Sequence, residues 1–295
     1  MKILVADPAK NITVFVLDPV EGATDRASIA RAILADKSLG AEQVGFVVPP
    51  EGASAGAVIG SGSRHGLWHL EMMGGEFCGN AARSFGLYAA RKQGLRGKAE
   101  VFISVSGADG PVQVEVDIEK GRAAAEMPKP QALKTLDYKG SPLPALIFEG
   151  ITHIIAPGTP ATAQTGGGSP PGFEANAEVF YAIKVLAEKQ LFPPGEDLPA
   201  ALGVMFYDAA AGFLRPAVYV RSTDTLVFES SCGSGCAALG AWLSRELRDG
   251  TVQYILSQSG GVIETEVFKK AGEIVRLTIG GEVKLGEQME YEPYS

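Results

Sequence analysis

Two Cys-Gly dipeptides hold the residues of this sequence that are best suited to proton transfer. Cys78 opens the segment Cys-Gly-Asn-Ala-Ala-Arg-Ser-Phe-Gly, and Cys232 opens the segment Cys-Gly-Ser-Gly-Cys-Ala-Ala-Leu-Gly. Both segments have a small polar residue two positions after the cysteine, small residues at the third and fourth positions after it, and glycine eight positions after it. The two cysteines lie about half the chain length apart. The sequence therefore predicts two similar halves, each presenting one thiol.

Each cysteine is expected to stand at the start of a helix. Small residues and then apolar residues follow both Cys-Gly pairs, which is typical of a turn that opens a buried helix. A thiol at this position faces unpaired backbone N–H groups and the positive end of the helix dipole, which favour the thiolate. The N–H groups of Gly79, Asn80, Gly233 and Ser234 are also suited to bind the carboxylate of a substrate.

Three interpretations fit such a pair of thiols. In the first, one cysteine removes a proton from a carbon acid and the other protonates the opposite face, while backbone donors stabilise the developing charge. In the second, the cysteines exchange thiol and disulfide forms, although no Cys-x-x-Cys motif is present. In the third, they are small buried hydrophobic residues. The matched segments favour chemistry for Cys78 and Cys232, whereas Cys236, one helical turn later, is expected in the core.

Composition excludes several classes of function. The net charge of −8, with no cluster of Lys or Arg to offset it, argues against a nucleic-acid partner. Three cysteines are too few for a disulfide scaffold, so a reducing compartment is expected. The sequence reaches Asp7 and Pro8 too early for a signal peptide and has no apolar run of the ~20 residues that span a bilayer. We therefore expect a cytoplasmic protein without a membrane partner.

No cofactor signature is visible. The three histidines show no spacing typical of metal ligands, and neither a dinucleotide-binding glycine motif nor a phosphate loop occurs in a suitable setting. We expect no metal and no cofactor. A racemase that works without pyridoxal phosphate is the simplest hypothesis.

The expected fold is α/β (α+β), with two pseudo-symmetric domains that each wrap a curved, mostly antiparallel sheet around a central helix. A chain of 295 residues is near the upper limit for one core. Paired prolines in 127–130 predict a boundary, giving an N-terminal half at 1–128 and a C-terminal half at 129–274. A terminal strand at about 275–295 is expected to complete the first half. If the halves face each other about a pseudo-twofold axis, both helix starts converge on one cleft.

Local patterns predict the elements within this plan. The expected strands are 2–6, 12–17, 42–48, 67–73, 99–106, 111–118, 122–127, 146–156, 203–207, 214–221, 225–229, 251–256, 262–268, 274–279 and 282–285. The Gly260-Gly261 and Gly280-Gly281 pairs predict hairpins. A helix is expected at 177–190, and the helix after Cys232 is expected to reach Leu247. Glycine-rich stretches at 51–66 and 165–172 predict loops.

Three polar residues in or beside these strands are candidates for substrate binding. Asn11 stands where the second strand begins, and spacing alone favours a turn residue there. Glu42 begins the next strand, where it is either solvated or directed at a ligand. His153 lies in an apolar strand of the second half.

The motifs resemble those of the diaminopimelate epimerase-like superfamily of cofactor-independent racemases. Phe77–Asn80 and Ser231–Gly235 match its two cysteine signatures, Lys10–Thr13 is similar to its N-terminal strand start, and Gly260-Gly261 falls where it has a glycine pair. The resemblance spans nearly the whole chain. It implies two opposed cysteines in two pseudo-symmetric α/β domains, and a homodimer, since dimers occur in the superfamily.

Diaminopimelate epimerases differ from this sequence where they bind the distal end of their substrate. Their Gly-Asn-Pro-His, Asn-x-Asn-Phe and Arg-Gly-x-Gly-Glu segments are replaced here by Gly150–His153, Gly203–Phe206 and Thr223–Glu229. The asparagines and the arginine are lost, so the second carboxylate of diaminopimelate would be unpaired. This departure argues against diaminopimelate as the substrate.

The sequence is more similar to the histidine racemase branch, which supplies D-histidine to opine-type metallophores such as staphylopine. The shared motifs are Glu42–Phe46, Gly75–Asn80, Val105–Gly107, Glu126–Pro128 and Glu229–Gly235. This resemblance implies racemisation of L-histidine, or a broad-specificity relative, with Cys78 and Cys232 as the two bases. It also implies that Glu42 contacts the substrate, where a carboxylate suits an imidazole N–H.

In this interpretation Asn11 and His153 bind the rest of a small amino-acid substrate. Diaminopimelate epimerase and proline-racemase-like activities remain alternatives within the superfamily. A thiol–disulfide redox protein, or a silent paralogue that binds a small molecule without catalysis, are the alternatives of other classes.

Overall fold

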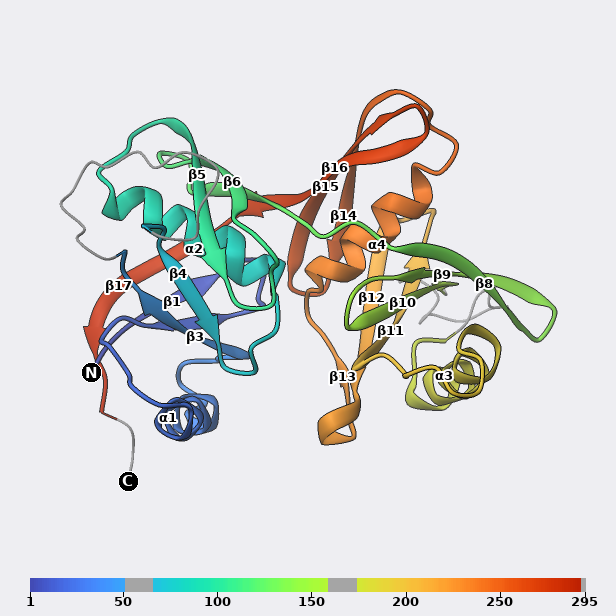
Figure 1. Cartoon of the computed structure of the whole chain (residues 1–295), viewed down its shortest axis with the longest axis horizontal. Coiled ribbons are helices and arrows are strands. Elements are labelled where there is room, and N and C mark those ends of the chain that lie inside the picture. Colours follow the sequence, from blue (N-terminus) through green and yellow to red (C-terminus); the bar gives the residue numbers. More distant parts are fainter. Residues whose placement is uncertain (51–65, 159–173, 293–295) are drawn as a thin grey trace. The chain divides into compact units, whose positions relative to one another are not determined.

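The computed structural model describes residues 1–50, 66–158 and 174–292, which form two units (Figure 1). Unit 1 combines Met1–Met127 with Thr278–Ser295, and unit 2 is Pro128–Leu277. The loop expected at 165–172 lies outside the described residues, as does the loop expected at 51–66 apart from Gly66.

Unit 1 places two helices against a mainly antiparallel sheet. Its helices are α1 (Ala23–Ala35) and α2 (Gly79–Lys92). Its strands are β1 (Lys2–Asp7), β2 (Thr13–Val16), β3 (Gln43–Val48), β4 (His69–Met72), β5 (Lys98–Val105), β6 (Val112–Asp117), β7 (Arg122–Glu126), the end of β16 (Glu273–Glu282) and β17 (Lys284–Glu290).

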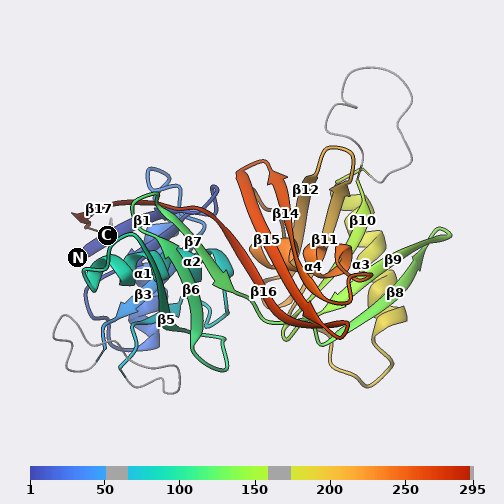
Figure 2. The ribbon, with the colours of Figure 1, turned by 90° about the horizontal axis from the view of Figure 1, so that it is seen from above.

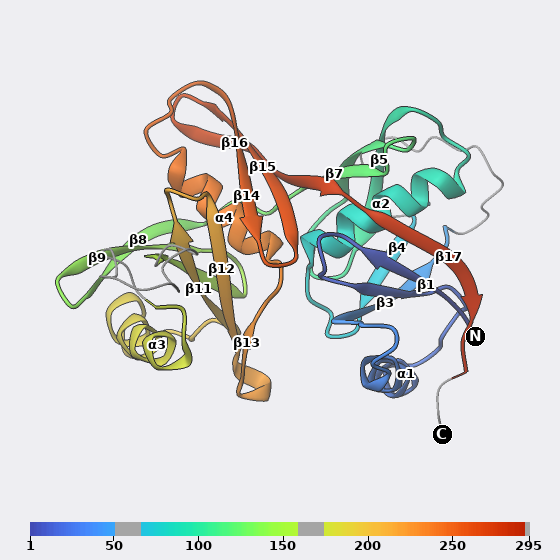
Figure 3. The same cartoon turned by 180° about the vertical axis from the view of Figure 1, so that it is seen from behind.

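The last two strands of the chain pair with two different strands of unit 1. β16 pairs antiparallel with β7, and β17 pairs antiparallel with β1. Figure 3 shows β17 following β1 toward the N-terminus. There the backbones of Met1 and Tyr291 exchange two hydrogen bonds of 2.8 and 2.7 Å. The C-terminal segment is therefore an integral part of unit 1.

The first three strands are buried on both faces, which explains their continuous apolar sequences. Because successive side chains point to opposite faces of a strand, Phe15 packs toward α2 while Val14 and Val16 pack toward Ile33 of α1. α2 is buried at every position from Gly79 to Ala90. A helix that is enclosed on all sides lies in a core, and most of the residues of α2 are small or apolar, although Asn80 and Arg83 are polar.

Unit 2 has the same kinds of elements. Its helices are α3 (Ala177–Leu191), α4 (Gly233–Leu243) and the short 3-10 helix η2 (Arg221–Thr223). Its strands are β8 (Ala132–Tyr138), β9 (Ser141–Ile147), β10 (Ile151–Pro157), β11 (Ala201–Asp208), β12 (Phe213–Val220), β13 (Thr225–Phe228), β14 (Gly250–Gln258) and β15 (Gly261–Lys270).

The order of strand pairings repeats between the units. β1–β2 and β9–β10 are antiparallel pairs, and β2–β3 and β10–β11 are parallel pairs bridged by α1 and α3. Antiparallel pairs β3–β4 and β11–β12 follow, and then the hairpins β5–β6 and β14–β15, the latter visible in Figure 2. The expected mixed α/β fold with mostly antiparallel sheets and one buried central helix in each half is confirmed.

Some local predictions were wrong. The strand expected at 146–156 is two strands, because Gly150 turns the chain with φ 75° and the N–H of Phe148 donates to the carbonyl of Ile151. The hairpin expected at Gly280-Gly281 is absent from the described structure, where both glycines lie inside β16. A Cβ atom on Gly280 would come within 3.0 Å of Ala124 Cβ, so glycine there permits close strand approach.

Other predictions need smaller changes. β8 was not predicted, and α4 ends at Leu243 rather than Leu247. The hairpin expected at Gly260-Gly261 is confirmed, with β14 ending at Gln258 and β15 beginning at Gly261. None of the helices in the described part of the chain combines the length and apolar character that a membrane span requires.

Candidate active site

Both cysteines of the matched segments are N-cap residues of buried helices. Cys78 precedes α2 with φ −121° and ψ 113°, and Cys232 precedes α4 with φ −122° and ψ 108°. Cys78 is half-buried, whereas Cys232 is 5% exposed. The backbone N–H of Ala81 donates to Cys78 Sγ at 3.4 Å. The two segments therefore produce almost the same local geometry, as their sequences predict.

Four of the predicted residues of unit 1 come together beside Cys78. Asn11 Nδ2 donates to Glu42 Oε2 at 2.8 Å, and Asn80 Nδ2 donates to Asn11 Oδ1 at 3.2 Å. The Cys78 thiol lies 3.9 Å from the same Asn11 oxygen. Gly79 is buried in the first turn of α2, where a Cβ atom would come within 2.8 Å of Ile279 Cδ1. The glycine thus allows the start of α2 to pack closely against β16.

A strained turn brings Asn11 to this position. Ala9 and Lys10 both have positive φ angles, 64° and 65°, which non-glycine residues rarely adopt. The backbone N–H of Lys10 donates to Asp7 Oδ1 at 2.7 Å and stabilises the turn. Strain of this kind persists only where the surrounding structure fixes it, and it is frequent at functional sites.

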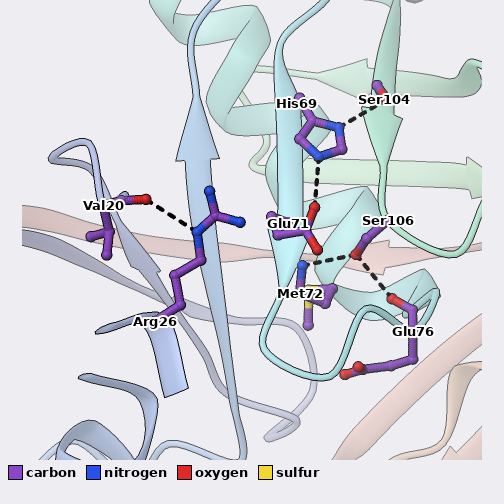
Figure 4. A network of polar contacts seen from close by, with 8 residues as sticks. All are labelled: Val20, Arg26, His69, Glu71, Met72, Glu76, Ser104 and Ser106. Carbon is purple, nitrogen blue, oxygen red and sulfur yellow. Dashed lines mark hydrogen bonds and ion pairs between the residues drawn. The ribbon is translucent and has the colours of Figure 1, made fainter. Parts of the chain in front are cut away.

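The segment before Cys78 is held by the Val105–Gly107 motif. Ser106 Oγ accepts from the N–H of Met72 at 2.8 Å and donates to the carbonyl of Glu76 at 3.3 Å (Figure 4). Gly107 has φ 72°, and a Cβ atom there would clash with the backbone of Glu76 and Phe77. The motif therefore fixes the approach of the chain to Cys78.

A second set of contacts ties β4 to β5 beside this motif. His69 Nδ1 lies 2.9 Å from Ser104 Oγ, and His69 Nε2 lies 3.1 Å from Glu71 Oε2 (Figure 4). The register of the two strands places His69 opposite Ser104. The contacts of this histidine are therefore structural ones within the sheet.

At Cys78 burial affects the pKa of the thiol more than the helix start does. The pKa of the Cys78 thiol is raised to about 11, mainly by burial and in part by the negative charge of Glu76, while the N–H of Ala81 and the amide of Gln43 act in the opposite direction. The sequence predicted that the helix start would favour the thiolate. That effect is present, but desolvation is larger.

The carboxyl group of Glu42 is also perturbed. Its partial desolvation raises its pKa, the hydrogen bond from Asn11 lowers it, and the negative charge of Asp7 raises it. Glu42 is exposed as a whole residue, and Asn11 holds one of its carboxylate oxygens.

In unit 2, His153 lies behind Ser234 rather than at the surface. His153 is 0% exposed, and its Nε2 atom lies 3.0 Å from Ser234 Oγ, which in turn lies 3.6 Å from Cys232 Sγ. Burial lowers the pKa of His153 to about 3, so its imidazole is neutral. Gly203 makes room for this ring, because a Cβ atom there would clash with His153 Nδ1. His153 therefore contacts Ser234 from the interior, and its role in substrate binding stays a prediction.

Cys232 is held by Gln258, which sequence reasoning missed. Gln258 Oε1 accepts from the N–H of Cys232 at 2.8 Å, and its Nε2 donates to Cys236 Sγ at 3.2 Å. Burial raises the pKa of the Cys232 thiol well above its usual range, as do the charge and hydrogen bond of Glu229, whereas Ser234 lowers it. Cys236 is fully buried, as expected of a core residue.

Gln43 and Glu229 were also missed as groups that tune a thiol. Both stand inside the quoted motifs Glu42–Phe46 and Glu229–Gly235, so polar residues within these motifs were the available signal. The described residues contain no group of three or more His, Cys, Asp or Glu side chains placed to hold a metal ion.

The fold is shared with solved structures of low sequence identity. A hydroxyproline epimerase from Agrobacterium vitis aligns with a TM-score of 0.58 and 14% identity, covering 98% of this chain and 91% of the epimerase. A phenazine biosynthesis protein of the PhzF family from Bacillus anthracis aligns with a TM-score of 0.61 and 16% identity, covering 99% of both chains. These likenesses show the fold.

A sequence relative is more specific. A histidine racemase from Fusobacterium nucleatum is 30% identical over 245 residues, which are 81% of this chain and 80% of the relative. The chain is an isomerase of the racemase and epimerase class. Residues 1–288 match the family described as "Histidine racemase CntK N-terminal domain", and the chain belongs to this family. The predicted resemblance to the histidine racemase branch is confirmed.

Proposed function

We propose that the chain interconverts L- and D-histidine by a two-base mechanism in which Cys78 and Cys232 act on opposite faces of the α-carbon. The observation that carries this proposal is the nearly identical N-cap geometry of the two cysteines at two buried helices. Membership of the histidine racemase family supports the reaction and the substrate.

Each turnover moves one proton off the α-carbon and one proton onto it. One cysteine enters as the thiolate, takes the α-proton and becomes a thiol, and the electron pair of the broken C–H bond passes into the substrate carboxylate. The other cysteine, entering as a thiol, donates its proton to the opposite face and becomes the thiolate. The raised pKa values of both thiols suit this exchange, because a strong base is needed to remove the proton and a thiol must be kept at the other position.

Backbone donors hold the carboxylate in this proposal. The N–H groups of Gly79, Asn80, Gly233 and Ser234 belong to the first turns of α2 and α4, where backbone N–H groups lack helical partners. They would bind the carboxylate most strongly as it gains charge, which lowers the barrier.

Recognition of the imidazole is assigned to Glu42. Glu42 is an exposed residue and has one carboxylate oxygen held by Asn11, which leaves the other oxygen able to accept an imidazole N–H. In the second unit, His153 would support Ser234 from behind, and Ser234 would in turn donate to Cys232 as the thiolate.

A panel of single L-amino acids in D₂O tests the reaction. We expect α-deuteration and loss of optical rotation with L-histidine, and the same with D-histidine. If no amino acid exchanges its α-proton, the racemase proposal is wrong. If another amino acid exchanges far faster than histidine, the reaction stands and the assigned substrate is wrong.

Serine variants test the two bases. Cys78→Ser and Cys232→Ser should each lower racemisation by about a thousandfold, while one-sided α-deuteration from a single enantiomer remains measurable. Cys236→Ser is the matched control and should still racemise, because a hydroxyl at this buried position can still accept the hydrogen bond from Gln258 Nε2. Normal racemisation by either of the first two variants would overturn the two-base assignment.

The resemblance also suggests the biological setting. We propose that the chain is a cytoplasmic homodimer that racemises histidine without a cofactor. Its product, D-histidine, would enter the synthesis of a metallophore. Gel filtration of the purified chain tests the dimer, and unchanged activity after exhaustive treatment with a chelator and with hydroxylamine tests the independence from metal and pyridoxal phosphate.

A further inference from the structure

We propose that Arg83 is a positioning residue for substrate recognition, because it fixes the orientation of two side-chain amides that hold Glu42. This inference rests on the proposed role of Glu42 in binding the imidazole of histidine. Arg83 lies in α2 and is 0% exposed.

A chain of hydrogen bonds leads from Arg83 to Glu42. Arg83 Nε donates to Asn80 Oδ1 at 3.1 Å, and Asn80 Nδ2 donates to Asn11 Oδ1 at 3.2 Å. Asn11 Nδ2 then donates to Glu42 Oε2 at 2.8 Å. Asn80 and Asn11 are 1% and 5% exposed, so water has little access to these amides.

Chemistry fixes the direction of the chain. A guanidinium group has only donors, so the amide oxygen of Asn80 must face Arg83. The NH₂ group of Asn80 then faces Asn11, which must present its oxygen. The NH₂ group of Asn11 is consequently left to face Glu42, and an ionised carboxylate can only accept. The cation at one end of the chain of hydrogen bonds and the carboxylate at the other end therefore require the same orientation of the two amide groups.

The same orientation determines what Cys78 meets. The Asn11 oxygen that accepts from Asn80 also lies 3.9 Å from Cys78 Sγ. If Asn80 reversed, its oxygen would face the oxygen of Asn11, and Asn11 would have to reverse as well. Glu42 would then lose its donor.

Arg83 also has a purely structural contact. Its Nη1 atom donates to the carbonyl of Glu282 at 3.0 Å, which joins α2 to β16. A structural role alone predicts lower stability after substitution, with no special relation to Glu42. The positioning role predicts that the effects of Arg83 and Glu42 on substrate binding are coupled.

The variants Arg83→Met, Glu42→Gln and their double variant measure this coupling through KM and kcat for histidine. We expect Arg83→Met to raise KM about tenfold, the effect of one lost hydrogen bond to a charged group, with a smaller change in kcat. In the Glu42→Gln background the same substitution should change KM by less than about twofold. Arg91→Met, an exposed arginine of the same helix, is the matched control and should leave KM unchanged.

Asn80→Asp gives a second test that does not remove the buried cation. The substitution keeps the size of the side chain and the partner of Arg83 but replaces the NH₂ group by an acceptor, which should reverse Asn11 and raise KM as Arg83→Met does. If the KM effects of Arg83→Met and Glu42→Gln multiply fully, or Asn80→Asp leaves KM at the original value, Arg83 is not a positioning residue. If Glu42→Gln itself leaves KM for histidine unchanged, the proposed role of Glu42 fails instead.

Discussion

His153 Nε2 lies 3.0 Å from Ser234 Oγ, so a fully buried imidazole supports the hydroxyl group next to Cys232. Ser234 Oγ is itself 3.6 Å from Cys232 Sγ and lowers the pKa of that thiol. A hydroxyl held by one partner is better oriented toward a second one than a freely rotating hydroxyl. The contact therefore links a histidine that substrate cannot touch to a proposed catalytic base.

Ser234→Ala tests this link. Removing the hydroxyl should raise the pKa of Cys232 further and lower the racemisation rate at pH 8 by about tenfold, since fewer enzyme molecules hold the productive thiolate. Ser234→Thr keeps the hydroxyl and is the matched comparison. Initial rates followed by circular dichroism provide the measurement, and an alanine variant as fast as the original chain at each pH would contradict the link.

The pH dependence of racemisation follows from the two raised pKa values. In the proposed mechanism the productive enzyme has one thiolate and one thiol. At neutral pH both cysteines of the free enzyme are thiols, because the pKa of Cys78 is raised to about 11 and that of Cys232 is also raised. The singly ionised form therefore grows as pH rises toward the lower of the two pKa values.

We therefore expect kcat/KM to rise about tenfold per pH unit above pH 7, after correction for the ionisation of histidine itself. The rate should fall again only when both thiols ionise. Initial rates at pH 7 to 10, with recovery checked by returning each sample to pH 8, measure the profile. A corrected profile that is flat over this range would show that an uncharged enzyme is the active form.

The placement of the two cysteines at helix starts could be predicted because it depends on local sequence. A thiol followed by glycine, small residues and an apolar run specifies a helix start, and both helices begin where expected, at Gly79 and Gly233. The strands at 146–156 were harder, because Gly150 sits in an apolar run that reads as one buried strand. Apolar and polar residues alternate only weakly in β8, where the apolar Leu133 is 54% exposed. Its sequence pattern therefore does not predict a strand.

The environment of the site could not be predicted from spacing. Asn11, Glu42 and Asn80 are far apart in the sequence and meet only through the register of β2 and β3 and the packing of α2. The ionisation of the thiols was also misjudged, because a helix start can be read from the sequence while the depth of burial depends on the whole fold.

The buried histidine should make the stability of unit 2 depend on pH. The pKa of His153 is about 3 in the folded chain and about 6.5 when unfolded, so its contribution to stability is fully present above pH 6.5. It is lost as pH falls toward 3, at roughly 1.4 kcal/mol per pH unit, because the unfolded chain binds the additional proton.

Urea unfolding at pH 7.5 and pH 5 tests this effect. Trp242 lies in α4 of unit 2, and Trp68→Phe leaves it as the single tryptophan, so its fluorescence follows that unit. His153→Gln should reduce the difference in unfolding free energy between the two pH values. If the difference is the same in both chains, His153 does not titrate as a buried neutral group.

Two glycines with the same φ angle allow the effect of backbone strain to be distinguished from that of steric contact near Cys78. Gly94 and Gly107 both have φ 72°, but an added Cβ at Gly94 meets nothing within 4 Å, whereas at Gly107 it would come within 2.7 Å of the Glu76 carbonyl carbon. Gly94→Ala should therefore cost only the backbone strain, about 1 kcal/mol of unfolding free energy, and leave activity intact.

Gly107→Ala should cost more unfolding free energy and displace the segment that leads into Cys78, which lowers kcat as well as stability. Paired measurements of unfolding and racemisation distinguish the two, and equal activity in both variants would show that the Val105–Gly107 motif does not position Cys78.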